Sequence, residues 1–387
     1  MRIGLDANTA LDPRNGAGHY TLDLIEELVR QAGEGDEVVV FHTGPEPAAP
    51  LAWLLRHERL IRVNVPARAR RSSEWWRSIA SPAVERTLPG GPATLDVLHA
   101  LQPPFLHSQA RRKILTVRAL DADPDAKLPL AFRRSLLHAD AVAVTSDGLL
   151  RELERRFART HPKKLGLLQS RLIRVSPGVH GRFLTPPRTA TVVGLCDAYP
   201  FLEEPYLLSP GGVADPERSL RLLIDACRLA RDRDPSLPPL VLLGRPGDTT
   251  SVAPILGSAQ AEGRVYWVQN LESDLLPALY RGAELLLYPG FDYAFGLPVL
   301  EAVAMGVPSI VGAACGAAEM LVAGVGVEVV EEMLAAESWA SALLALHRDE
   351  GRRRALAESG QAIARSQTWE AVAKRHWELY RESSPER

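Results

Sequence analysis

Short apolar runs alternate with amphipathic stretches along the whole chain. Runs of this kind predict β-strands, and stretches whose apolar positions recur every three or four residues predict helices. Their alternation is typical of βαβ units built around a parallel sheet. The expected strands of the first half are Arg2–Asp6, Glu37–His42, Val97–His99, Ile114–Val117, Ala141–Thr145 and Leu172–Val175. Those of the second half are Tyr206–Ser209, Leu240–Leu243, Val265–Val268, Leu285–Tyr288, Ser309–Val311 and Gly326–Val329.

Helical patterns separate these strands and divide the chain into two series. We expect them at Tyr20–Gln31, Leu130–His138, Asp147–Phe157, Leu220–Asp232, Asp274–Arg281, Val299–Met305, Trp339–Leu346 and Trp369–Glu382. Between the two series, periodicity is poor and prolines collect, which predicts a linker. We therefore expect a first domain over residues 1–183, a linker over 184–204, a second domain over 205–368, and a closing helix over 369–387 that packs back toward the first domain. A ligand cleft between two such domains would lie at the carboxyl ends of their strands.

Composition narrows the class of protein. The 387 residues suit two or three domains at about 150 residues each. The formal net charge of −2 gives no general attraction for nucleic acid or an anionic membrane, and no nucleic-acid-binding module is recognised. Three scattered cysteines predict neither a disulfide framework nor a metal site. Because there is no apolar signal region and no apolar run of the ~20 residues that span a bilayer, we expect a cytoplasmic protein.

A glycine turn follows the first strand. Gly16 and Gly18 open the first helix, where glycine lets the backbone approach a ligand and a helix N-terminus favours an anion. The full dinucleotide-binding fingerprint is absent because no third glycine follows at the required spacing. A tight turn without a ligand is an equal alternative.

The strongest candidate site is the segment Tyr288–Ala302. An apolar strand leads through a loop with Gly290 and Gly296 into a helix with a proline in its first turn. The amides of Phe295, Gly296 and Leu297 then lie at a helix N-terminus, where they suit phosphate or sugar oxygens. Glu301, in the opening turns, could accept hydrogen bonds from a ribose diol, or it could only complement the helix dipole.

Several segments, in order, resemble those of the family 4 glycosyltransferases of the GT-B fold. They are RIGLDANTALDPRNGAGHYTLDLIEEL, ADAVAVTSDGLLREL, LIRVSPGVHGRF, PYLLSPGGVADPERSLRLLIDA, VYWVQNLESDLLPALYRGAELLLYPG and FGLPVLEAVAMGVPSIVG. The resemblance covers most of the chain. It implies an α/β protein with two Rossmann-like domains whose parallel sheets face each other across a cleft.

The resemblance also implies an activity. The second domain would bind a nucleotide sugar as substrate, and a hydroxyl of a carbohydrate, lipid-linked or small-molecule acceptor would attack the anomeric carbon with retention, without a metal or cofactor. Gly16 and Gly18 match the family's glycine loop, and Phe295-Gly296-Leu297 match its amides near the sugar. Glu301 matches the glutamate that binds ribose, and Arg218 matches a phosphate-binding lysine.

Three positions depart from the family pattern. Tyr293 stands where a sugar-binding glutamate is expected, Arg118 replaces a histidine that contacts the transferred sugar, and Gly212 lies where the first basic partner of Arg218 is expected. Two interpretations stay open: an enzyme with an unusual donor contact, or a homologue that has lost catalysis and acts as a binding or partner subunit. We favour the glycosyltransferase. Arg118 is a candidate catalytic residue that could reach the diphosphate across the cleft.

Two weaker features complete the candidates. Arg68–Arg77 combines basic residues with paired tryptophans and could touch anionic lipid at the inner face of a membrane, although a solvated loop is the interpretation we favour. His99, at a strand end, could act in catalysis, but a lone histidine at such a place is more often structural. A nucleotide-dependent epimerase or dehydrogenase is disfavoured by the incomplete glycine fingerprint.

Overall fold

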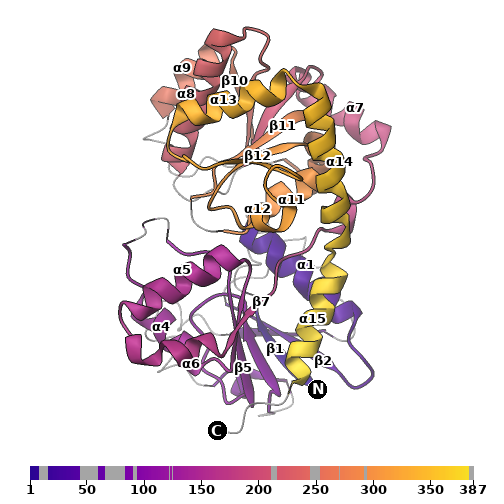
Figure 1. Cartoon of the computed structure of the whole chain (residues 1–387). Helices are drawn as coiled ribbons and strands as arrows, with labels where there is room; N and C mark the ends of the chain where they lie inside the picture. Colours follow the sequence, from indigo (N-terminus) through magenta and orange to yellow (C-terminus); the bar gives the residue numbers. More distant parts are fainter. Residues whose placement is uncertain are drawn as a thin grey trace. The chain divides into compact units, whose positions relative to one another are not determined.

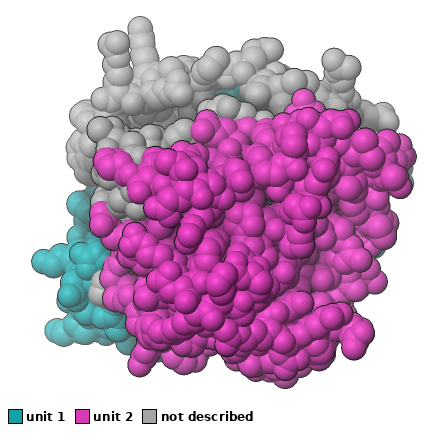
Figure 2. All heavy atoms as spheres, turned by 90° about the horizontal axis from the view of Figure 1, so that it is seen from above, with its two compact units in different colours: residues 1–177, 369–387 teal, residues 178–368 magenta. Residues whose placement is uncertain are grey.

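The structure is a computed structural model of the chain, and it describes residues 1–7, 16–43, 60–65, 83–89, 94–121, 123, 125–210, 216–244, 253–269, 271–291 and 294–382. The chain forms two compact units, which Figure 2 colours separately. Unit 1 comprises Met1–Pro177 together with Trp369–Arg387, and unit 2 comprises Gly178–Thr368.

Unit 1 is built on a seven-stranded parallel sheet of order β3-β2-β1-β4-β5-β6-β7 (Figure 1). Its strands are β1 Arg2–Asp6, β2 Glu37–Thr43, β3 Leu60–Val65, β4 Val97–Ala100, β5 Arg112–Val117, β6 Ala141–Val144 and β7 Leu172–Arg174. Its helices are α1 Gly16–Arg30, α4 Leu130–His138, α5 Asp147–Ala158, α6 Leu165–Gln169 and α15 Trp369–Arg381, with the 3₁₀ helices η3 Val84–Thr87 and η4 Pro162–Lys164.

Unit 2 is built on a six-stranded parallel sheet of order β10-β9-β8-β11-β12-β13. Its strands are β8 Tyr206–Pro210, β9 Leu240–Leu243, β10 Val265–Val268, β11 Ala283–Tyr288, β12 Ser309–Gly312 and β13 Glu328–Val330. Its helices are α7 Thr189–Ala198, α8 Pro216–Arg233, α9 Ala253–Ala261, α10 Leu276–Gly282, α11 Leu297–Ala304, α12 Gly316–Leu321, α13 Ala336–His347 and α14 Glu350–Ser366, with η5 Gly181–Phe183, η6 Pro200–Leu202 and η7 Ser273–Leu275.

Both sheets reverse their strand order next to the first strand of the unit. In unit 1, β1 lies between β2 and β4, and in unit 2, β8 lies between β9 and β11. In each neighbouring pair, β1/β4 and β8/β11, the chain therefore crosses over from the two strands in opposite directions along the sheet. A crevice opens at the carboxyl ends of strands at such a switch point, which is where ligands bind in doubly wound folds.

The predicted linker over residues 184–204 is wrong. This stretch contains α7 and η6, and its Leu195 and Leu202 are buried in the core of unit 2. The prolines that suggested a linker flank these short helices rather than interrupt them, since proline is tolerated outside a helix and in its first turn. The first unit accordingly ends at Pro177 and not at residue 183. Just beyond this boundary, the Val179 amide donates to the Gln367 carbonyl at 2.7 Å, within unit 2.

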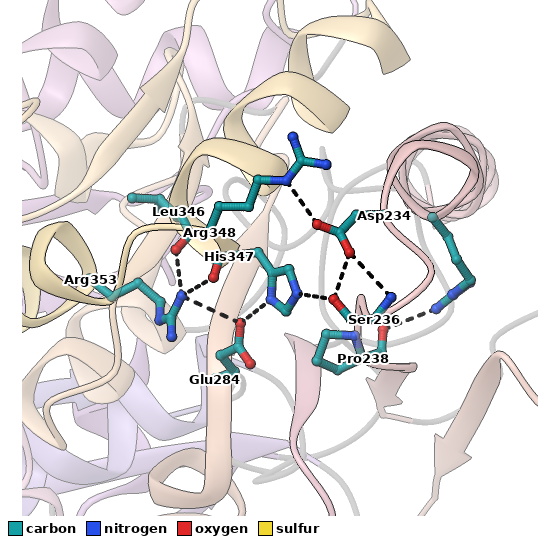
Figure 3. A network of polar contacts seen from close by, with 9 residues as sticks. Asp234, Ser236, Pro238, Glu284, Leu346, His347, Arg348 and Arg353 are labelled. Atoms are coloured by element: carbon teal, nitrogen blue, oxygen red, sulfur yellow. Dashed lines mark hydrogen bonds and ion pairs between the residues drawn. The ribbon is translucent and has the colours of Figure 1, made fainter.

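A polar network ties the turn after α8 to the ends of α13 and the start of β11 (Figure 3). His347 Nδ1 lies 2.7 Å from Glu284 Oε1, and its Nε2 lies 3.2 Å from the Ser236 hydroxyl. Ser236 in turn donates to Asp234 Oδ1 at 2.6 Å. These hydrogen bonds, with Arg348 donating to Asp234, hold the pKa of Asp234 down at about 2. The Ser236 hydroxyl donates to a carboxylate, and Glu284 lies at the start of β11. We therefore interpret the network as structural: it holds these segments together at the amino edge of the sheet.

The last helix, α15, belongs to unit 1 and packs on α1. Tyr20 and Trp369 meet edge to face with ring centroids 5.0 Å apart, and Trp377 Nε1 donates to the Leu28 carbonyl at 3.2 Å. Aromatic side chains bury large apolar areas, so this helix is a substantial part of the unit 1 core.

A fully buried histidine pair joins α15 to the sheet. His99 has its ring nitrogens 2.7 Å from the Tyr380 hydroxyl and 2.7 Å from the Thr116 hydroxyl. The His376 ring stacks on His99 with centroids 5.3 Å apart, and its Nδ1 lies 2.9 Å from the Val372 carbonyl. Burial lowers the pKa of His99 well below its usual value and lowers the pKa of His376 to about 4. Both rings are therefore neutral in the folded protein near neutral pH.

Acid should weaken unit 1 through these histidines. An unfolded histidine binds a proton below about pH 6.5, whereas the folded rings do not until much lower pH, so the free energy of unfolding falls as the pH drops through this window. Between about pH 7.5 and 5.5, each neutral histidine should account for a loss of about 1.4 kcal/mol. We expect His376→Phe to remove its share of the loss in denaturant titrations at the two pH values. An unchanged pH dependence in this variant would contradict the assignment.

Candidate functional site

The crevice at the β8/β11 switch point of unit 2 contains the main candidate site. A pocket of about 490 Å³ lies there, within the usual size range of small-ligand sites. It is bordered by one face of α8, by Phe291 after β11, and by the residues at the start of α13. Its lining residues are Arg218, Arg221, Leu222, Asp225, Phe291, Leu334 and Ala336.

Arg218 and Phe291 form the contact at the centre of this pocket. Arg218 lies in the first turn of α8, and Phe291 follows β11. The guanidinium carbon lies over the phenyl ring, 5.1 Å from its centroid. Such a cation–π contact is worth about 0.5–1 kcal/mol at an exposed site, and it orients the guanidinium without neutralising its charge. An oriented arginine at a helix N-terminus suits a phosphate oxygen.

Two glycines shape the loop between β11 and α11. Gly290 has φ +56° and Gly296 has φ +83°, a region that other residues rarely adopt. A Cβ atom at Gly296 would also come within 2.6 Å of Cys315 Sγ. The glycine at 296 is therefore required both by backbone conformation and by packing.

The first turn of α12 holds this loop from the other side. The Gly316 amide donates to the Ala294 carbonyl at 3.1 Å, and the Ala317 amide donates to the Phe295 carbonyl at 2.6 Å. The Phe295 and Leu297 side chains are buried. Among the described residues, no acceptor bonds the amides of Gly296 and Leu297. Both residues are buried, and their amides lie at the start of α11, where a helix leaves amides without an intrahelical partner.

Glu301 lies inside unit 2 and does not line the pocket. Its side chain is 6% exposed, and its Oε2 accepts a hydrogen bond from the Tyr280 hydroxyl at 3.0 Å. Burial, together with the adjacent carboxylate, raises the pKa of Tyr280 well above its usual value, so the tyrosine stays protonated and donates. The sequence placed Glu301 and Arg218 in one donor site; of the two, Arg218 lines this pocket and Glu301 is bonded to Tyr280 inside the unit.

A second group of candidates meets at the carboxyl edge of the unit 1 sheet. Gly16 begins α1 and is exposed, whereas Gly18 is buried. Arg118 directly follows β5; its Nε donates to the Leu101 carbonyl at 3.1 Å, and its guanidinium lies 5.3 Å from the centroid of Tyr20 on α1. Arg118 thus contacts the helix that the glycine turn opens.

The remaining candidates divide into one core residue and several that lie outside the described part of the chain. His99 is completely buried, with both ring nitrogens engaged, so we assign it to the core rather than to catalysis. Tyr293, Gly212 and the segment Arg68–Arg77 fall outside the described residues.

Six of the seven lining residues were not predicted as site residues, and two of them, Arg221 and Phe291, bear on the chemistry. Arg221 lies three positions after Arg218 on α8, and helical spacing alone would have placed it on the same face. Phe291 lay in the quoted segment but gave no sign that it would face an arginine. Its role depends on the tertiary contact between α8 and the β11 loop.

The described residues contain neither a metal-binding cluster nor a membrane-spanning helix. No group of three or more His, Cys, Asp or Glu side chains that could hold a metal ion occurs in the described ranges. Within the same part of the chain, no helix is long and apolar enough to cross a membrane.

Comparison with known proteins identifies part of the chain. Residues 200–363 match the family model described as glycosyl transferases group 1. The D-inositol 3-phosphate glycosyltransferase of Salinispora tropica is 33% identical over 195 residues, which cover 48% of this chain and 40% of that protein. The matched part of the chain thus spans about two fifths of that relative's length.

Solved structures extend the likeness to the whole fold. Sucrose-phosphate synthase from Thermosynechococcus elongatus has a TM-score of 0.70 at 19% identity and covers 98% of each chain. Anabaena HepE, solved in complex with UDP and glucose, has a TM-score of 0.69 at 16% identity and covers 98% of this chain and 99% of its own. At such identities the likeness concerns the fold, which is GT-B with two Rossmann-like α/β units. The predicted fold class and the resemblance to the group 1 glycosyltransferases are confirmed.

The glycine conformations at the site predict a stability test. Gly296→Ala forces a side chain into a left-handed backbone and against Cys315, and we expect it to lower the free energy of unfolding by about 1–3 kcal/mol. Gly194→Ala, at an open position within α7, should instead stabilise by about 0.5–1 kcal/mol. Denaturant titration measures both variants. Equal effects of the two substitutions would show that Gly296 has no special conformational role.

Proposed function

We propose that this chain, whose residues 200–363 form a group 1 glycosyl transferase domain, transfers a sugar from a nucleotide-sugar donor to an acceptor hydroxyl. The observation that carries the proposal is Arg218 held over Phe291 in a pocket at the switch point of the unit 2 sheet. This arrangement supplies an oriented positive charge at the place where a doubly wound fold binds a ligand.

The reaction requires the protein mainly to position the two substrates and to stabilise the charge on the departing diphosphate. The bond between the anomeric carbon and the diphosphate oxygen breaks, a bond from that carbon to the acceptor oxygen forms, and the proton of the acceptor hydroxyl passes to the departing diphosphate. Negative charge grows on the departing diphosphate, so a fixed cation beside it stabilises the transition state more than the ground state. Arg218 and the amides at the start of α11 are the unit 2 groups that we assign to this role. We propose that the reaction retains anomeric configuration and needs neither a metal nor a cofactor.

The acceptor is the less defined substrate. The relative from Salinispora tropica is named for D-inositol 3-phosphate, which makes phosphorylated polyols the first acceptors to test, beside carbohydrate and lipid-linked hydroxyls. We also propose that the protein acts in the cytoplasm. Contact with the inner face of a membrane through Arg68–Arg77 stays a prediction from the sequence.

A second candidate is a homologue that binds nucleotides but no longer transfers sugar. It is favoured by the burial of Glu301, whose carboxylate accepts a hydrogen bond from Tyr280, and by the enclosure of His99 in the core. In the same direction, Arg118 is bonded to the Leu101 carbonyl. The two candidates differ in turnover and share nucleotide binding.

A donor panel separates them. We expect turnover of at least one uridine or guanosine diphosphate sugar, either to water or to an acceptor from the classes above, followed by release of the nucleoside diphosphate. Added EDTA should leave the rate unchanged, and the product's anomeric proton in NMR should have the configuration of the donor. Arg218→Gln should lower kcat/KM by about tenfold or more, since a charge-assisted contact is lost.

The outcomes distinguish the two candidates. Nucleotide binding by calorimetry without turnover of any donor would favour the catalytically impaired homologue. The absence of any nucleotide binding would contradict both.

A further inference from the structure

The pocket of unit 2 contains a second arginine, Arg221, which the family pattern does not include. Arg221 is exposed and lines the pocket together with Arg218. The two residues are three positions apart on α8, so their Cβ atoms lie about 5–6 Å apart on one face of the helix. Both guanidinium groups can therefore reach one anion in the pocket.

The described residues that line the pocket carry a net positive formal charge. Two arginines and one acid, Asp225, line it, which gives a formal charge of +1. The residues opposite α8 are apolar: Phe291, Leu334 and Ala336. The N-terminal end of α8 adds a partial positive charge on the same side.

We propose that Arg218 and Arg221 together bind one phosphate group of the ligand, with Arg221 supplying the second cation that the sequence lacks at Gly212. The identification of this ligand as the diphosphate of a nucleotide sugar rests on the proposed function. A planar guanidinium can bond two oxygens of a phosphate at once, so a pair of them holds its position and orientation.

The orientation of Arg218 strengthens this assignment. Its guanidinium carbon lies 5.1 Å from the centroid of the Phe291 ring, which also lines the pocket. Arg221 lies almost one helical turn farther along α8, so both side chains leave the helix on its pocket face. The two together form a two-point receptor for an anion.

Asp225 sets the inner limit of this site. It lies one turn beyond Arg221 on the same pocket face, and its carboxylate repels a phosphate. The phosphate is thereby confined to the part of the pocket near the start of α8. Removal of the acid should consequently tighten phosphate binding, opposite in sign to the removal of either arginine.

Isothermal titration of the full chain with inorganic pyrophosphate, UDP and GDP tests the proposal. Arg221→Gln should weaken the binding of pyrophosphate, and of whichever nucleotide binds, by about tenfold or more. Arg221→Lys keeps the charge without the fork and should lie between this variant and the parent. Asp225→Asn should tighten binding by a few-fold.

Arg228→Gln is the matched control. Arg228 is an exposed arginine of the same helix that does not line the pocket, so its loss removes the same charge without removing a contact. Its affinity should stay within about twofold of the parent, because exposed charges separated by about a Debye length are largely screened. Circular dichroism melting of each variant checks that the helix is intact.

Each result has one meaning. If Arg221→Gln and Arg228→Gln bind all three ligands like the parent, Arg221 is no phosphate ligand, and the proposed function stands if turnover is seen. If binding depends on Arg221 but no donor is turned over, the phosphate site stands and the transferase does not. If the parent protein binds neither pyrophosphate nor a nucleotide, both proposals are wrong.

Discussion

The reversal of strand order between β8 and β11 is the constraint on which the rest of unit 2 depends. Right-handed crossovers from these neighbouring strands lead to opposite faces of the sheet, so their carboxyl ends are left with a crevice between them. The chain fills its margins with α8 on one side and the glycine loop before α11 on the other. Arg218 and Phe291 meet because these two connections start from adjacent strands. The topology of the sheet determines where the pocket lies, and single residues then determine its charge.

Unit 1 has the same reversal of strand order, but different side chains lie at the carboxyl ends of its strands. At the carboxyl edge of its sheet, Arg118 contacts a backbone carbonyl and the Tyr20 ring, while His99 is buried in a core that α15 covers. The last helix of the chain thereby completes the unit in which the chain began. The core between this helix and the sheet contains a pair of buried neutral histidines, so the stability of the core depends on pH.

Much of the fold could be predicted from the pattern of apolar positions. The central strands of both sheets are near-continuous apolar runs because both of their faces are buried, and such runs are easily recognised. The edge strand β3 was missed because its sequence, LIRVNV, interleaves polar residues with apolar ones. Helix α14 was missed as well, since its sequence is rich in arginine and alanine and has only a few buried positions. The prolines around α7 were misread as a linker because local composition does not reveal which segments are packed against a core.

The candidate site could be predicted only where it depends on a short segment of the sequence. Gly296 and the turn into α11 follow from a short segment whose backbone needs glycine. Arg221, the facing of Phe291 and the burial of Glu301 depend on how α8, the β11 loop and α10 come together, which no local pattern specifies. The resemblance to a known family supplied Arg218 but could not show that a neighbouring arginine shares its pocket.

The central claim is that the switch-point pocket of unit 2 binds the phosphates of a nucleotide. Amide hydrogen exchange measured with and without saturating UDP or GDP tests it directly. We predict slower exchange at the first two turns of α8 and around residues 294–300, with α9 unchanged as an internal reference. A nucleotide that binds while exchange at α8 and at the start of α11 stays the same would contradict the claim.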